Sequence, residues 1–271
     1  MATIVHVIRT KDGDALVGVM WAQDPGWEGR KDGVVGSKAE FARDLFDGAA
    51  RGYDRLAAWL SYGQYRRWHM FLTSRLPVGR NALVLDVATG TCAVAIDLAE
   101  RYGCRVVGVD LAARMLESGR RRVARAGLSD RIRLVRATAE RLPFRSAAFD
   151  ALTVTYLLRY VDSPADVVAE MGRVVRPGGW MASLEFDLPR GMWYALWKAH
   201  TRIVLPLAGR VVSPGWRAIG EFLGPSIETF ARRHPPHQVA SWWEAAGFRD
   251  IRWRRLSLGG AIVLWGQKRD G

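Results

Sequence analysis

The sequence has little cysteine and little histidine. Its 271 residues include two cysteines, Cys92 and Cys104, and five scattered histidines. Two cysteines exclude a scaffold built on several disulfides, and their spacing relative to histidine matches no zinc-binding pattern. We therefore expect a fold stabilised by a buried core, with no metal site.

Long apolar runs are also lacking. No stretch approaches the roughly 18 apolar residues that a membrane-spanning helix needs. Residues 1–7 lack the basic segment that precedes the apolar part of a secretory signal. We therefore expect a cytoplasmic protein, with peripheral contact to the inner face of the membrane as a further possibility.

Acidic residues and lysine are scarce relative to arginine. Lysine and arginine total 40 against 27 acidic residues, a formal charge of +13, and only five of the 40 are lysine. This excess favours an anionic partner, although a solvated arginine-rich surface explains it equally well. Most of the twelve tryptophans lie away from the arginine clusters, and Trp193 and Trp197 lie among apolar residues. That distribution favours an apolar pocket or a membrane-interface surface, and we expect no nucleic-acid partner.

Hydrophobic patterning divides the chain into two parts. Residues 3–8 and 15–21 are short β-rich runs around an Asp-Gly turn, which predicts a hairpin. Residues 22–37 are rich in glycine and aspartate and are typical of a linker. We therefore assign residues 1–37 to an N-terminal extension and residues 38–271 to one domain.

Within this domain, helical and strand patterns alternate. Helical periodicity over residues 40–75 comes first. Short apolar runs then predict buried strands at 82–87, 105–109, 132–136, 151–155 and 180–186, with helices at 93–102, 113–126 and 164–175. A helix at 236–246 and strands at 251–256 and 261–267 follow. The pattern predicts an α/β fold: a doubly wound, Rossmann-like, mostly parallel seven-stranded sheet with an antiparallel C-terminal hairpin.

The stretch at residues 190–225 interrupts this alternation. Residues 191–212 are helical and apolar, with basic residues spread among them. We interpret the stretch as a helical lid over an apolar acceptor that also touches an anionic membrane surface. Ordinary packing against the sheet is the alternative.

One strand–loop–helix segment carries the strongest functional signal. A buried strand ends at Asp86, a loop of small residues around Gly90 follows, and the next strand ends at Asp110. Small residues let a ligand approach the backbone, and a carboxylate at the second strand end can accept hydrogen bonds from both ribose hydroxyls. The glycine spacing of a pyrophosphate-binding loop is absent. The segment therefore favours a nucleoside ligand without a pyrophosphate, with S-adenosylmethionine (SAM) as the leading candidate.

Further segments extend this pattern to a known family. They are residues 46–54 (FDGAARGYD), 60–63 (LSYG) with 66–68 (RRW), 139–144 (AERLPF), 184–189 (LEFDLP), 224–230 (GPSIETF) and 256–268. Together with the SAM loop, they resemble the ubiquinone/menaquinone-biosynthesis C-methyltransferases, within the class I SAM-dependent methyltransferases. The resemblance covers about residues 41–268 and implies methylation of a quinol ring.

The resemblance also implies which residues contact SAM. By matching position, the family's contacts fall on Thr91, Asp110, Thr138, Ala139 and Thr155. The full set of candidate cofactor-binding residues is Tyr53, Asp86, Ala88, Gly90, Thr91, Asp110, Leu111, Met115, Thr138, Ala139, Glu140 and Thr155. For Tyr53, closure over SAM and core packing both remain open.

The chain departs from the family pattern at several positions. Cys92 replaces a glycine in the loop, Ala93 replaces an acid, and Thr138 replaces the Asp or Asn that touches adenine. We expect the Cys92 thiol to lie near the methionine part of SAM. The family's Gly-Leu-Arg-Asn after the fourth strand reads Leu-Leu-Arg-Tyr at residues 157–160, and an Asn-Asp pair becomes Ala at 57–58. The cofactor site is thus intact in outline, whereas positions near the acceptor are altered, so the departures bear on the quinone substrate more than on the methyl transfer.

The candidate catalytic residues are Arg159, Tyr156 and Glu185. Arg159 follows the fourth strand at the ligand-binding edge, and as a permanent cation it is assigned stabilisation of a phenolate or positioning of water. A surface ion pair with Asp162 is its alternative. Tyr156 orients the acceptor or simply packs, and Glu185 is a base or a structural partner for the N-terminal helices. His69 is interpreted as a helix-face residue rather than a catalyst.

Together these features predict a SAM-dependent methyltransferase acting on a hydrophobic small molecule. C-methylation of a quinol or phenol ring is the leading reaction. An O- or N-methyltransferase of a specialised metabolite is the first alternative, and a SAM-binding protein that interacts with RNA is a remoter one. A homodimer also remains open.

Overall fold

The computed structural model describes residues 4–9, 15–20, 37–49, 57–59 and 61–270. The strands β1 (Ile4–Arg9) and β2 (Ala15–Met20) pair antiparallel, as the sequence predicts. Their connecting turn, most of the predicted linker and Tyr53 lie outside the described residues. The division into an extension and a domain therefore stays a prediction.

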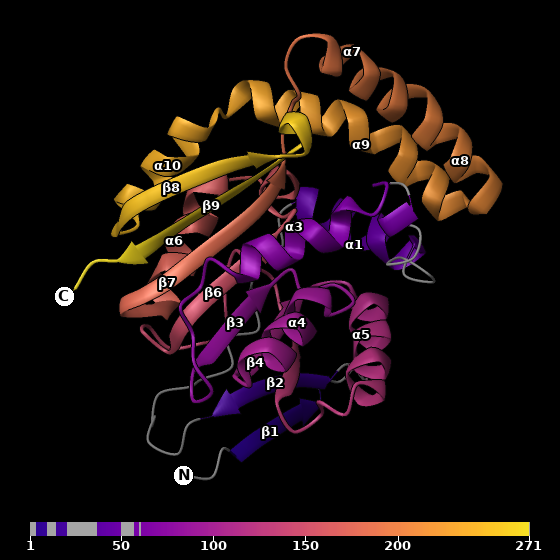
Figure 1. Ribbon diagram of the computed structural model, residues 1–271. Coiled ribbons are helices and arrows are strands. Elements are labelled where there is room, and N and C mark those ends of the chain that lie inside the picture. The colour runs from indigo at the N-terminus through magenta and orange to yellow at the C-terminus, as the bar shows by residue number, and fades with distance from the viewer. Residues whose placement is uncertain (1–3, 10–14, 21–36, 50–56, 60, 271) are drawn as a thin grey trace.

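Seven strands form one sheet in the order β5-β4-β3-β6-β7-β9-β8 (Figure 1). They are β3 (Leu83–Val87), β4 (Arg105–Asp110), β5 (Ile132–Arg136), β6 (Phe149–Thr155), β7 (Val175–Phe186), β8 (Phe248–Leu256) and β9 (Ala261–Lys268). The first five strands in this order run parallel, and β9 pairs antiparallel with both β7 and β8. The predicted Rossmann-like sheet with an antiparallel hairpin is confirmed.

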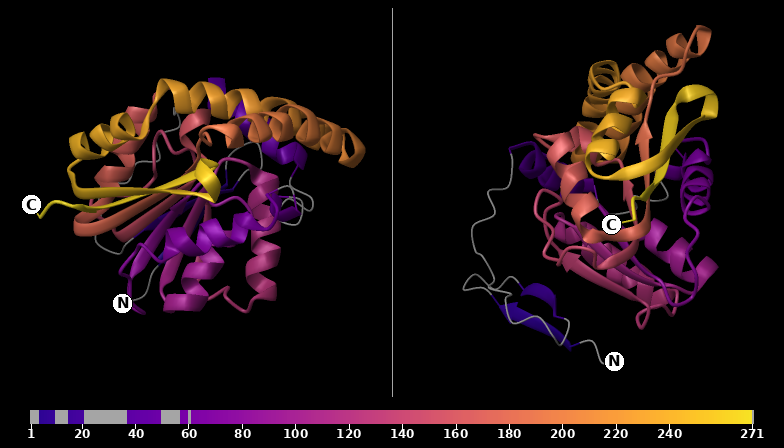
Figure 2. Two further views of the ribbon diagram at one scale, coloured as in Figure 1. Left: turned by 45° about the horizontal axis from the view of Figure 1, so that its top comes forward. Right: turned by 90° about the vertical axis from the view of Figure 1, so that its left-hand side faces the viewer.

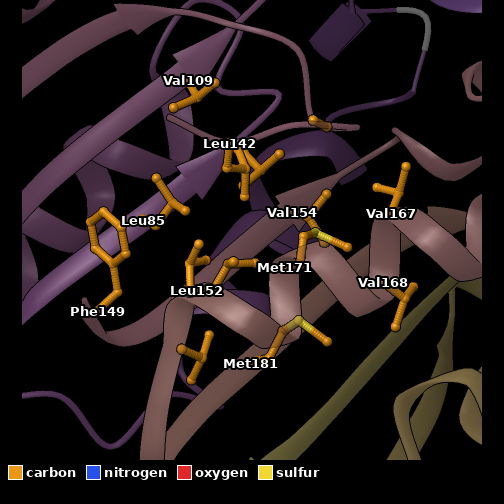
Figure 3. Close-up of a cluster of buried hydrophobic side chains, with 14 of the residues drawn as sticks. Leu85, Val109, Leu142, Phe149, Leu152, Val154, Val167, Val168, Met171 and Met181 are labelled. Carbon is orange, nitrogen blue, oxygen red and sulfur yellow. The ribbon is translucent and has the colours of Figure 1, made fainter. Parts of the chain in front are cut away.

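Helices cover both faces of this sheet. They are α3 (Gln64–Thr73), α4 (Ala93–Tyr102) and α5 (Ala113–Arg125) on one face, with α6 (Pro164–Val174) and α10 (Pro236–Ala245) on the other. Successive strand residues point to opposite faces. Val84 of β3 accordingly packs with α3 and α4, while Leu85 packs with Met171 of α6 (Figure 3). Two short 3₁₀ turns, η1 (Leu158–Tyr160) and η3 (Ser257–Gly259), follow β6 and β8.

A helical insertion follows β7 and lies beyond its C-terminal end (Figures 1 and 2). It consists of α7 (Met192–Ala199), a π-helical turn η2 (His200–Val204), α8 (Leu205–Val212) and α9 (Pro214–Arg233). The helical pattern expected at 191–212 is confirmed, whereas the 20-residue α9 was missed because proline and glycine interrupt its pattern. Those glycines serve close packing, since a Cβ on Gly220 would lie 2.5 Å from the carbonyl oxygen of Leu205.

The helix α1 (Ser37–Ala49) lies between the insertion and the helix that follows β4. It packs against α9 on one side and α5 on the other. Oδ1 of Asp47 accepts a hydrogen bond from the backbone N–H of Arg114, 2.9 Å away in the first turn of α5. The first backbone N–H groups of a helix have no partner within the helix, and Asp47 supplies an acceptor for one of them in α5. This hydrogen bond ties α1 to α5.

Candidate active site

Asp86, near the end of β3, shapes the loop that follows this strand. Its carboxylate oxygens accept hydrogen bonds from the hydroxyls of Thr89, at 2.6 Å, and Thr153, at 2.7 Å. Burial raises the pKa of Asp86 to about 6, against the opposing effect of these hydrogen bonds. Sequence reasoning expected Asp86 to contact the cofactor. The structure instead places it behind the loop, and it does not line the adjacent cavity.

Asp110, the last residue of β4, lies on the cavity wall. Its Oδ2 accepts a hydrogen bond from the backbone N–H of Gly90 at 2.7 Å, and its Oδ1 accepts one from Ala112 at 2.9 Å. Burial raises the pKa of Asp110 to about 6, although both backbone hydrogen bonds act to lower it. Each carboxylate oxygen retains a further lone pair, so this group can still accept hydrogen bonds from a diol.

The cavity beside Asp110 has a volume of about 120 Å³. Ten of the predicted cofactor-binding residues line it: Ala88, Gly90, Thr91, Asp110, Leu111, Met115, Thr138, Ala139, Glu140 and Thr155. They come from the loop after β3, the end of β4 with the start of α5, the segment after β5, and the end of β6. These are neighbouring strand ends in the order of the sheet. The strand–loop–helix pattern and the family resemblance together thus predicted residues that the fold brings to one cavity.

The far end of this cavity suits an amino-bearing ring. Thr138 Oγ1 donates a hydrogen bond to Oε2 of Glu140. The other carboxylate oxygen, Oε1, is enclosed and accepts no hydrogen bond from the described part of the chain. A buried acceptor without a donor is costly, so a ligand amine there is favourable. With apolar Leu111 and Met115 on the same wall, the residues fit the adenosyl part of SAM.

Two helices that precede the sheet complete the wall of this first cavity. The sequence analysis did not predict their contribution. Phe46 of α1 and Tyr65 and His69 of α3 line the cavity. Phe46 belongs to a segment that carries the family resemblance, and Tyr65 lies between two others, at residues 60–63 and 66–68, which was the available signal. Burial lowers the pKa of His69 to about 3, with a further contribution from the charge of Arg122. The imidazole is therefore neutral at physiological pH, and the interpretation of His69 as a residue other than the catalyst stays a prediction.

The prediction for Cys92 is wrong. This residue adopts a left-handed backbone conformation with φ 65°, where a glycine is most easily accommodated. Its side chain is fully buried in the core between α3, α4 and the sheet, and it does not line the cavity. A Cβ on Gly119 of α5 would lie 2.5 Å from its sulfur. The thiol therefore fills the space that a glycine in α5 leaves and does not face the cavity.

A second cavity of about 620 Å³ lies between the sheet end and the helical insertion. Its lining is mostly aromatic and aliphatic. Trp193 and Trp197, four residues apart on α7, both line it, and Trp216 and Ile219 line it from α9. No acidic side chain occurs among the described residues of its wall. A cavity of this size and polarity suits a hydrophobic small molecule.

Arg159 is the permanently charged residue in the described wall of this second cavity. It is 9% exposed, and its Nη1 donates a hydrogen bond to Oε2 of Glu185, 2.8 Å away. The other oxygen of Glu185 accepts a hydrogen bond from the backbone N–H of Leu158 at 2.8 Å. Burial raises the pKa of Glu185, and the charge of Arg159 opposes that rise. The alternative of a surface ion pair with Asp162 is wrong, because Arg159 is buried and bound to Glu185.

The two cavities meet at aromatic residues. Phe46, Tyr65, Tyr156 and Tyr160 belong to the walls of both. Tyr156 follows β6 with φ 56°, and its ring stacks on that of Phe186, with centroids 4.5 Å apart. A ligand that reaches these rings in the cavity beside Asp110 therefore lies next to a molecule bound in the second cavity.

The sequence matches the ubiE/COQ5 methyltransferase family over residues 34–268. The ubiquinone/menaquinone biosynthesis C-methyltransferase UbiE of Geotalea daltonii is 32% identical over 85% of this chain and 97% of its own length. The protein of the same name from Syntrophotalea carbinolica is 36% identical, over 82% of this chain and 92% of its length. The demethylmenaquinone methyltransferase of Mycobacterium bovis is 35% identical, over 81% and 88%.

Solved structures share the fold at much lower sequence identity. The [4+2]-cyclase SpnF has a TM-score of 0.62 at 17% identity, over 89% of this chain and 100% of its own. Haemonchus contortus phosphoethanolamine N-methyltransferase 2, in a complex with S-adenosylhomocysteine, has a TM-score of 0.61 at 15% identity, over 87% and 61%. At these identities the likeness concerns the fold alone.

Proposed function

Since the chain belongs to the ubiE/COQ5 methyltransferase family and is a SAM-dependent methyltransferase, we propose that it methylates a ring carbon of a hydrophobic quinol or phenol. The observation that carries this proposal is the junction of the two cavities. A cavity that fits SAM, with Asp110 and Glu140 in its wall, opens onto a larger and mainly apolar one, and Arg159 in the wall of the larger cavity is paired with the buried Glu185 behind that wall.

SAM supplies an activated methyl group, and the chain must place an acceptor carbon in line with it and exclude water. We assign the ribose hydroxyls to Asp110 and the adenine amine to Glu140. Loss of the phenolic proton to bulk water, as the acceptor enters, raises the electron density of the ring carbon that attacks. After the methyl group is transferred, that carbon releases its own proton to water. Arg159 faces the acceptor cavity and stabilises the resulting phenolate, since a guanidinium stays charged throughout.

Glu185 acts through Arg159 in this scheme. An unpaired guanidinium buried in an apolar wall is strongly unfavourable, and a carboxylate at 2.8 Å offsets that cost. The same carboxylate binds the backbone at Leu158 and so fixes the turn that carries Arg159. Tyr156 borders the ring of the acceptor and orients it at the junction.

The acceptor assay decides between C-methylation and the nearest alternative. The altered residues at 157–160 favour an O- or N-methyltransferase as the second candidate. Purified protein is incubated with isotopically labelled SAM and a panel of prenylated quinols, simple phenols and amines. Mass spectrometry detects the product, and NMR locates the methyl group. A methyl on a ring carbon supports the proposal, whereas a methyl found only on oxygen or nitrogen contradicts it.

We further propose that the insertion contacts an anionic membrane surface from which the acceptor is drawn. The α7–α8 segment exposes large apolar side chains that include Met192, Leu196, Ile203, Leu207 and Val211, which is 88% exposed. Lys198, Arg202 and Arg210 lie among them. Apolar and basic side chains on one helical surface are typical of peripheral membrane contact. In the described part of the chain, no helix has the length and apolarity to cross a bilayer.

Two sets of variants separate the acceptor cavity from the membrane surface. Trp193→Ala combined with Trp197→Ala is expected to raise the KM for the acceptor without changing SAM affinity. Leu207→Ser combined with Val211→Ser, which leaves the cavity wall intact, is expected to reduce co-sedimentation with anionic vesicles. Trp253→Ala on exposed β8 is the matched control. Equal sedimentation of the wild type with anionic and neutral vesicles contradicts the membrane proposal, and concentration-dependent dimers would assign the apolar surface to a second copy.

A further inference from the structure

The strand β8 forms one edge of the seven-stranded sheet. In the described part of the chain it pairs with β9 alone, so no other strand of the sheet bonds to the backbone groups on its outer side (Figure 1). The pairing with β9 shifts between Arg249 and Arg252, where Asp250 has φ 53°. The regular part of this edge is therefore Arg252–Leu256. Such an edge is a template for an added strand, and its side chains decide which strands can pair with it.

Arginine side chains gather on one face of this edge. Arg252 and Arg254 are both exposed, and since they are two residues apart they point to the same face of the sheet. Arg254 lies opposite Val263 of β9, which packs in the core on the side of α3. The guanidinium carbon of Arg254 lies 5.5 Å from the ring centroid of Phe71 in α3, and that of Arg75 lies 4.6 Å from the same centroid. Two cations are thus held beside one ring.

The segments that carry these arginines contain no acidic residue. None occurs at residues 55–85, which include α3, or at residues 251–268, which include the regular part of β8 and all of β9. Asp250 and Asp270 pair with Arg249 at the other end of β8. Cations held close together repel one another, and a bound anion relieves that repulsion. The arginines also oppose pairing with β8 of a second copy, which would bring like charges together.

The opposite face of the same edge is different. Trp253 lies opposite Leu264, which packs in the core on the side of α6, and it is 43% exposed. Arg255 shares this face, and its Nε donates a hydrogen bond to Oδ2 of Asp187 at 2.6 Å. A strand added to β8 therefore meets cations on one face and an indole ring on the other. Because side chains alternate along a strand, acidic residues separated by single apolar residues match both faces.

We propose that β8 binds an extended segment of a partner protein in which acidic and apolar residues alternate. The segment adds to the sheet as a further strand along Arg252–Leu256. Its carboxylates face Arg252 and Arg254, and an apolar side chain covers Trp253. A nucleic acid or a membrane would supply anions but no strand backbone to pair with this edge. None of these three side chains lines either cavity, so the partner and the methyl transfer are compatible.

Short labelled peptides of identical composition test the strand addition. In one peptide glutamate and valine alternate, and in the other the glutamates and the valines form separate blocks. Fluorescence anisotropy with the full chain at physiological salt is expected to show about tenfold tighter binding of the alternating peptide. Hydrogen–deuterium exchange should slow within Arg252–Leu256 when that peptide binds. An alternating peptide with a methyl group on every backbone nitrogen keeps its charges but cannot donate to β8, and it should not bind.

Variants of the chain test the charges. Arg252→Glu combined with Arg254→Glu should weaken the alternating peptide about tenfold or more, because two attractive cross-strand pairs become repulsive. Arg120→Glu combined with Arg125→Glu makes the same change in net charge at exposed residues of α5 and should leave the Kd unchanged. All four side chains are exposed, and thermal unfolding checks that each variant folds.

Several outcomes would overturn this assignment. If the alternating peptide does not bind, or binds no better than the block peptide, β8 is not a site for such a strand. Binding of the N-methylated peptide would show that attraction of charge alone explains the contact. An RNA oligonucleotide or phosphatidylglycerol vesicles that bind through Arg252 and Arg254 when the peptide does not would assign the face to that partner. Self-association lost in the double variant at these two arginines would assign the edge to a second copy of the chain.

Discussion

Lowering the pH is expected to weaken SAM binding through one carboxyl group. Asp110 must be ionised to accept hydrogen bonds from both ribose hydroxyls, and burial raises its pKa from the ordinary 3.8 to about 6. At pH 7.5 nearly all of it is ionised, whereas at pH 5, one unit below its pKa, about one molecule in ten is. If the ligand binds the ionised form, its Kd should rise about tenfold between pH 7.5 and pH 5, which corresponds to about 1.4 kcal/mol.

Isothermal titration calorimetry at half-unit steps from pH 5 to pH 8 measures this dependence. Asp110→Asn should bind SAM weakly and with little dependence on pH over that range. The stability of the protein changes in the opposite direction. Because burial raises the pKa of both Asp86 and Asp110 to about 6, the folded state holds protons that the unfolded state has released. The free energy of unfolding therefore falls as pH rises from about 4 to about 6.

Because these two carboxyl groups make the folded protein more stable at low pH, their titration does not explain weaker binding at pH 5 by unfolding. A Kd for the wild type that stays constant from pH 7.5 to pH 5 would refute the assignment of the ribose to an ionised Asp110. The same dependence in wild type and Asp110→Asn would assign the titration to another group.

Two further predictions concern packing and the buried ion pair. Gly119→Ala should lower the free energy of unfolding by about 1–3 kcal/mol, because its Cβ would lie 2.5 Å from the sulfur of Cys92. Adding Cys92→Gly should recover most of that loss and retain turnover, and denaturant unfolding that shows additive losses would contradict this contact. Glu185→Gln should destabilise by about 3 kcal/mol and reduce turnover with little change in SAM affinity, because it leaves Arg159 buried without a carboxylate. Combining Glu185→Leu with Arg159→Met should restore the Tm without restoring turnover, and recovered turnover would exclude Arg159 from catalysis.

Local patterns in the sequence determined the sheet and the outline of the cofactor site. Buried parallel strands are short apolar runs, and their ends must meet at one edge, so the positions of Gly90 and Asp110 along the chain placed them together in space. The residues Thr138 to Glu140 follow a third strand in the same way. Each of these inferences depends on a residue and its near neighbours, which is the range over which hydrophobic periodicity and turn chemistry operate.

Only the tertiary structure decided the acceptor cavity and the direction of single side chains. The wall of that cavity joins Phe46, Tyr156 and Trp216, which are far apart in the chain and carry no shared local pattern. Arg159 has Asp162 nearby in sequence, yet the fold pairs it with Glu185 on the neighbouring strand β7. The family resemblance indicated that Cys92 stands where a glycine is usual, and its backbone is left-handed. The direction of its thiol, however, depends on the space left by Gly119 in α5. Such contacts follow from how layers pack, and packing is a property of the whole chain rather than of any segment in it.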